Sequence, residues 1–126
     1  MKTRVFQDVN DPALIEMILD GAVGILPTDT VYGLVAKANR KSAVDRLYQI
    51  KPRHLQPGTI IGASIDTFRD LGFHEDVLRR CLSYWPNSIS VVLNATHVET
   101  YLKKRRDALP VRIPKAQKLT KLLQET

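Results

Sequence analysis

Cysteine is almost absent from this sequence. The single residue, Cys81, cannot form a disulfide within the chain, which excludes a disulfide-stapled scaffold. It lies on the apolar side of the segment VLRRCLSYW, where we expect a buried core thiol rather than a reactive one. No apolar run approaches the roughly 20 residues of a membrane-spanning helix, and the N-terminus has no apolar signal core. We therefore expect a cytoplasmic protein without a membrane partner.

Common cofactor motifs are missing as well. The chain has neither a Walker-type glycine-rich loop nor a Gly-x-Gly-x-x-Gly sequence, which argues against P-loop and Rossmann nucleotide sites. The three histidines, His54, His74 and His97, do not have the spacing of metal ligands. The sequence therefore predicts no resident metal.

The composition is that of a globular protein. The chain has 126 residues, 44% of them hydrophobic and 25% charged, which predicts one domain over residues 1–126. Its formal net charge of +6 favours an anionic partner such as a nucleotide, a phosphate or a nucleic acid, without choosing among them.

Helical and strand-like patterns alternate along the chain. Asp11 and Pro12 have the residue types of an N-cap and a first helical turn, and Leu82 is expected on the buried face of a later helix. The patterns predict helices over 11–21, 42–50, 65–72, 74–85 and 115–125, and strands over 22–26, 34–38, 58–64, 88–94 and 109–114. The alternation predicts an α/β fold with a mixed sheet.

Two cations follow the helix at 42–50. Lys51 and Arg53 flank Pro52 in IKPRH, and an extended backbone places positions i and i+2 on one face. Such a pair can clamp phosphate oxygens, with arginine as a fork and lysine as a point charge. The alternative is a solvated basic turn.

The segment PTDTVYG offers two hydroxyls and a carboxylate. Thr28, Asp29 and Thr30 follow a buried strand, so they could line a site. They could equally form a turn whose side chains bond their own backbone. We expect Asp29 to fix a loop rather than to act as a catalytic base.

Arg112 stands inside the apolar strand LPVRIP. An arginine in such a run needs a partner, because burying an unpaired charge is unfavourable. That partner could be an internal carboxylate or the carboxylate of a bound molecule.

The run KKRR at 103–106 is dense in positive charge. It is either a solvated face or a contact for a nucleic acid.

The order of these segments resembles the YrdC/Sua5 family of threonylcarbamoyl-adenylate synthases. The resemblance rests on LPTDTVYGL, IKPR, YWPNSISVVL and LPVRIP and extends over nearly the whole chain. It implies a twisted, largely open mixed sheet with helices on its faces and a large concave, positively charged cavity.

The resemblance also implies a reaction. Threonine, bicarbonate and ATP, with Mg²⁺ sharing the phosphate charge, would give threonylcarbamoyl-AMP and pyrophosphate for t6A modification of tRNA. Proteins that transfer the threonylcarbamoyl group would act downstream, and tRNA or double-stranded RNA is a further expected partner. Lys51 and Arg53 match the basic pair that holds the ATP phosphates and carries the catalysis.

Four residues match substrate positions of the family. Thr30, with Thr28 beside it, is implied to contact the substrate threonine, and Arg112 to hold the threonine carboxylate. Ser90 keeps a hydroxyl where the family has a threonine.

The sequence departs from the family in three places. WPNSIS replaces the usual Trp-Pro-Gly-Pro-Leu-Thr, and RHLQPGT replaces an Arg-Pro stretch. The family continues with a Ser-Thr-Ser-Ala-Asn stretch that these 126 residues do not contain. We therefore expect a C-terminally incomplete domain with exposed apolar surface and weak or absent turnover. The alternative is a non-catalytic or divergent YrdC-like protein that binds RNA or a nucleotide.

Overall fold

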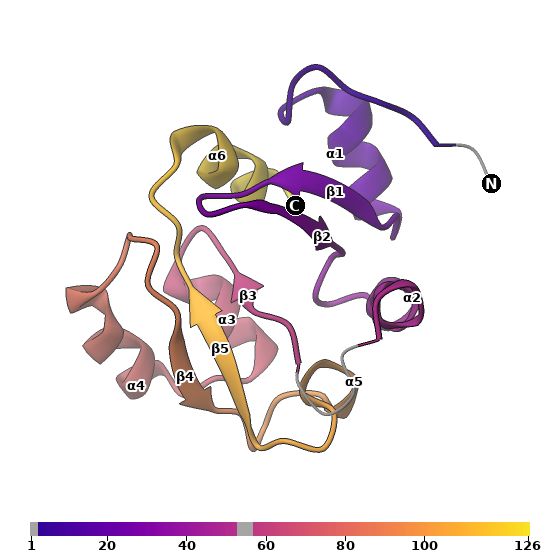
Figure 1. The fold of residues 1–126 in the computed structure, drawn as a ribbon. Coiled ribbons are helices and arrows are strands. Elements are labelled where there is room, and N and C mark those ends of the chain that lie inside the picture. The colour runs from indigo at the N-terminus through magenta and orange to yellow at the C-terminus, as the bar shows by residue number, and fades with distance from the viewer. Residues whose placement is uncertain (1–2, 53–56) are drawn as a thin grey trace.

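The computed structural model describes residues 3–52 and 57–126, and Figure 1 shows how their elements are arranged. The helices are α1 (Pro12–Leu19), α2 (Lys41–Ile50), α3 (Ile65–Leu71), α4 (Glu75–Arg80), α5 (Thr100–Lys103) and α6 (Gln117–Glu125), with a 3₁₀ turn, η1, at Cys81–Ser83. The strands are β1 (Gly24–Pro27), β2 (Tyr32–Val35), β3 (Ile60–Ile61), β4 (Val91–Asn94) and β5 (Ala108–Arg112). The part of the chain that is described contains no helix long and apolar enough to cross a membrane.

The strands form two sheets. β1 and β2 make an antiparallel hairpin, while β5 lies between β3, to which it is parallel, and β4, to which it is antiparallel. The predicted α/β class with a mixed sheet is confirmed. Within the described residues the hairpin does not pair with the three-stranded sheet, so side-chain contacts hold the two together.

The larger core lies against the three-stranded sheet. Phe68 of α3 packs on the rings of Phe73 and Trp85, and Leu109 and Val111 of β5 are fully buried beneath them. Cys81 belongs to this core, which confirms the expected buried thiol.

A smaller core supports the hairpin. Ile18 of α1, Leu26 of β1, and Leu119 and Leu122 of α6 form it, and Figure 1 shows α1 and α6 beside the hairpin. Ile61 of β3 packs against this cluster and links it to the other sheet. The hairpin therefore stands over the end of β5, and its 28–31 turn comes close to Arg112.

Several local predictions hold and others do not. Asp11 caps α1 by accepting from the Ala13 N–H at 2.8 Å, as its residue type indicated. The predicted helix at 74–85 instead ends at Arg80 and continues as η1, which turns Leu82 outward to 46% exposure. The strand expected over 58–64 is reduced to β3, and α5 was not predicted, because four residues carry too little periodicity.

Candidate functional site

Arg112 is the last residue of β5. Leu109 and Val111 point into the larger core, so strand alternation turns Arg112 to the opposite side, toward the hairpin. Its side chain is only 11% exposed. Strand β5 thus places the nearly buried guanidinium of Arg112 between the three-stranded sheet and the hairpin.

The partner of Arg112 is an internal carboxylate. Its Nη2–H donates to Asp29 Oδ1 at 2.9 Å, and the Asp29 side chain is 3% exposed. Its Nη1–H donates to Ser90 Oγ at 2.9 Å. Of the two partners that the sequence left open, the structure has the carboxylate of the chain itself, joined to an arginine 83 positions away.

This pair is only half formed. Arg112 Nε and Asp29 Oδ2 are both buried, and neither has a hydrogen-bond partner among the residues that the structure describes. A side-on arginine–carboxylate pair would use both atoms. This one ion pair therefore keeps an unused donor and an unused acceptor.

The two predicted threonines form the hairpin turn. Thr28 donates from its N–H and from Oγ1 to the Val31 carbonyl, at 3.2 and 2.5 Å, and the Thr30 N–H donates to Thr28 Oγ1 at 3.4 Å. This confirms the turn interpretation for their local bonding. It also explains how Asp29 is aimed, because the closed turn leaves the Asp29 side chain directed at Arg112.

Ser90 is held by its own loop. Trp85 Nε1–H donates to the Ile89 carbonyl at 2.8 Å, and the Asn87 N–H donates to the Ile113 carbonyl at 3.0 Å. The backbone N–H of Asn87 thus ties the loop to the segment after β5. The Ser90 hydroxyl is thereby placed within reach of Arg112.

Of the two cations in the predicted phosphate clamp, the structure describes only Lys51. Lys51 is exposed at the end of α2, where its N–H donates to the Leu47 carbonyl. Arg53 lies outside the described residues. The joint role of the two cations stays a prediction.

Two lysines of the basic run at 103–106 have side-chain contacts within the chain. Lys103 Nζ donates to the carbonyls of Ala95 and Thr96 at 2.9 and 3.1 Å, and Lys104 Nζ lies 4.1 Å from the centre of the Tyr48 ring. The cationic surface available to a nucleic acid is correspondingly smaller than the sequence suggests.

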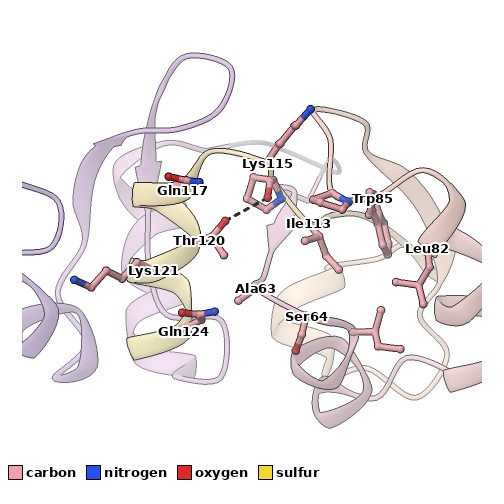
Figure 2. Close-up of a pocket in the computed structure, with 13 residues that line it drawn as sticks. Ala63, Ser64, Leu82, Trp85, Ile113, Lys115, Gln117, Thr120, Lys121 and Gln124 are labelled. Carbon is pink, nitrogen blue, oxygen red and sulfur yellow. Dashed lines mark hydrogen bonds between the residues drawn. The ribbon is translucent and has the colours of Figure 1, made fainter.

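A cavity of about 590 Å³ opens elsewhere, between α6 and the segment that carries Trp85 (Figure 2). Ile113, Leu82 and Trp85 form its apolar side, and Lys121 and Gln124 of α6 lie across from them. None of the predicted site residues that the structure describes lines it. Within 3–52 and 57–126, no three histidine, cysteine or acidic side chains gather as they would around a metal.

Sequence reasoning missed the role of Asp29. It singled out Asp29 and Arg112 separately, each as a residue in need of an explanation, but not as partners. The one available signal was chemical, because a carboxylate just after one apolar strand and an arginine within another are complementary. The fold and the site together define an α/β protein in which a nearly buried arginine of the sheet pairs with an aspartate of the hairpin turn.

Comparison with known proteins gives the family. The family model Sua5_yciO_yrdC, described as "Telomere recombination", matches residues 16–126, and the chain belongs to this family. Among curated relatives, threonylcarbamoyl-AMP synthase of Pseudoalteromonas translucida is 30% identical in an alignment 119 residues long that covers 90% of this chain and 64% of the relative. The enzyme of the same name from Xanthomonas axonopodis pv. citri is 32% identical in an alignment 105 residues long that covers 79% of this chain and 56% of the relative.

Solved structures agree on the fold. P. abyssi Sua5 complexed with L-threonine is 28% identical with a TM-score of 0.75 and covers 90% of this chain, which corresponds to 34% of that protein. E. coli YciO has 22% identity and a TM-score of 0.72 over 90% of this chain and 57% of its own length, and it supports the fold alone. The chain spans between about half and two thirds of the length of the curated relatives it matches.

Proposed function

We propose that this chain forms part of an L-threonylcarbamoyladenylate synthase, a nucleotidyltransferase that makes threonylcarbamoyl-AMP for t6A modification of tRNA. The observation that carries the proposal is Arg112, nearly buried at the end of β5 and held by Asp29 and Ser90 from two other segments. A guanidinium fixed in this way is suited to a small carboxylate. The names of the curated relatives support the same reaction.

In this proposal the residues at the hairpin hold the amino acid. Arg112 receives the threonine carboxylate, and Ser90 keeps the guanidinium oriented while Thr30, which is exposed on the turn, offers a hydroxyl to the substrate. Holding the carboxylate fixes the position of the amine. That placement favours reaction with bicarbonate: the α-ammonium releases a proton to solvent, and the free amine then gives a carbamate and water.

The remaining step requires that the negative charges of the carbamate and the phosphates be neutralised. A carbamate oxygen attacks the α-phosphorus of ATP, and pyrophosphate leaves with the electrons of the broken bond. Lys51, together with Arg53, would neutralise the phosphates at this step. Asp29, the carboxylate at the site, is already engaged by Arg112, so we propose that magnesium arrives as part of MgATP.

The first test is ligand binding by the chain itself. L-threonine and MgATP are titrated separately into ¹⁵N-labelled protein, and Arg112→Gln is compared with the exposed control Arg105→Gln. We expect Arg112→Gln to weaken L-threonine roughly tenfold or more and to leave MgATP unchanged. An unchanged threonine affinity in Arg112→Gln would remove the basis of the proposal.

The second test is product formation. The chain is incubated with ATP, L-threonine and bicarbonate, and threonylcarbamoyl-AMP and pyrophosphate are measured by mass spectrometry. We expect weak turnover at most, because the chain covers 64% of its relative from Pseudoalteromonas translucida. Any product formed should be lost in Lys51→Ala and in Arg112→Gln, and product that persists in both would contradict the assigned roles.

A further inference from the structure

The half-formed pair between Arg112 and Asp29 has an unusual distribution of unused bonding groups. One hydrogen bond joins Nη2 to Oδ1, while Nε and Oδ2 are shielded from solvent and unpaired within the described part of the chain. Both side chains are close to full burial. Buried polar atoms are nearly always hydrogen-bonded, so two unpaired ones in a single ion pair indicate bonds that something else completes.

The two unpaired atoms need different hydrogen-bond partners. Arg112 Nε needs an acceptor, and a carboxylate supplies one. Asp29 Oδ2 needs a donor, and a cationic donor gives the strongest bond. An α-amino acid zwitterion suits both atoms, because it presents a carboxylate acceptor and a cationic donor a few bonds apart.

We propose that Asp29 determines ligand selectivity at this site: its Oδ2 receives the α-ammonium of an amino acid whose carboxylate is held by Arg112. The inference rests on the proposed function and adds to it the reason that zwitterions are preferred. Both unused atoms are shielded in the free chain, so a ligand can reach them only if the 28–31 turn shifts.

The charge at the site explains why a plain carboxylate binds less well. Asp29 already neutralises Arg112, so a second anion meets a carboxylate as well as a guanidinium. Ser90, the other partner of Arg112, is neutral and does not discriminate between the two kinds of ligand. An α-ammonium next to Oδ2 offsets the repulsion and completes the missing bond.

The experiment compares two ligands that differ in one group. L-threonine and (R)-3-hydroxybutyrate, which lacks only the amino group, are titrated into the ¹⁵N-labelled chain at pH 7. The proteins are the unaltered chain, Asp29→Asn, Ser90→Ala and the exposed control Asp70→Asn. Asp29→Asn keeps the size of the side chain and an acceptor for Nη2 but removes the negative charge.

We expect the unaltered chain to prefer L-threonine by about tenfold or more, the size of one hydrogen bond between charged groups. Asp29→Asn should reduce the preference to within roughly threefold, mainly by weakening L-threonine. Ser90→Ala should weaken both ligands and keep their ratio, and Asp70→Asn should change neither. This pattern distinguishes a loss of selectivity from a general loss of affinity for both ligands.

Results that would overturn the inference differ from the result that would overturn the proposed function. Equal affinity of the unaltered chain for the two ligands overturns the inference while the proposed function stands, and this result needs no variant to fold. A preference that survives in Asp29→Asn overturns it as well. If neither ligand binds the unaltered chain, the threonine site of the proposed function is itself overturned.

Discussion

Lys103 holds two backbone carbonyl groups with one side chain. Its ammonium donates to Ala95 and Thr96 and is mostly shielded from solvent, so it closes the loop between β4 and α5. The nearby Asp107 is too exposed to add much, since surface ion pairs contribute little. At the scale of the residue, Lys103 therefore stabilises the fold, although the sequence suggested only surface charge.

We therefore predict that Lys103→Ala lowers the free energy of unfolding by about 1.5 kcal/mol or more. Two carbonyls lose a charged donor, whereas Arg105→Ala, at an exposed neighbour, should change stability by less than about 0.5 kcal/mol. Urea denaturation of both variants measures the difference. Equal stability of the two would show that the bonds of Lys103 contribute nothing. Tests of RNA binding at 103–106 should accordingly use Arg105→Ala.

At the scale of the element, Gly72 ends α3. Its φ of +114° belongs to the left-handed region, and a Cβ there would lie 2.5 Å from the His97 carbonyl oxygen. The backbone at His97 cannot shift away as easily as the end of a flexible side chain could. Helix α3 can therefore end and lead into Phe73 only because this position is glycine.

Gly72→Ala should destabilise the protein by about 1–3 kcal/mol from the backbone conformation, with the clash adding to it. Gly24→Ala in β1 is the matched control, because a Cβ there meets no atom within 4 Å. Thermal unfolding should show a clearly lower midpoint for Gly72→Ala and little change for Gly24→Ala. Similar midpoints for the two variants would argue against the observed end of α3.

Cys81, the first residue of η1, gives a second test at this scale. Burial raises the pKa of its thiol, so the thiolate fraction at a given pH is lower than for a free cysteine. We expect slow labelling by a disulfide reagent at pH 8 in the native chain and prompt labelling in denaturant. Rapid stoichiometric labelling without denaturant would contradict the packing around η1.

At the scale of the whole molecule, the hairpin carries an uncovered apolar face. The register of β1 and β2 puts Ile25, Pro27 and Tyr32 on the side away from α1 and α6, and Ile25 and Tyr32 are 69% and 74% exposed. Exposed apolar surface on a sheet favours association with other chains. The exposed apolar surface expected from the sequence thus lies on this face of the hairpin.

We predict that the weight-average mass of the chain rises with concentration. Ile25→Thr should reduce this association, whereas Val5→Thr, at a residue 88% exposed outside any strand, should not. Sedimentation velocity and light scattering over a concentration series measure it. A monomer at all concentrations, or equal effects of the two variants, would refute a role for the hairpin face.

The sequence by itself determined what depends on near neighbours and on residue chemistry. Asp11 and Pro12 predicted the start of α1, because a helix cap is made within a few residues. The helical periodicity of residues 115–125 predicted α6, which forms at Gln117–Glu125. The apolar strand around Arg112 likewise required that the guanidinium have a partner.

Only the tertiary structure decided which partner Arg112 has. Asp29 lies 83 positions away, and it reaches Arg112 because the β1–β2 register closes the 28–31 turn and the smaller core holds the hairpin over the end of β5. The division into two sheets and the outward turn of Leu82 were decided at the same level. Contacts of this kind depend on how packed elements meet, and no local pattern of residues encodes that.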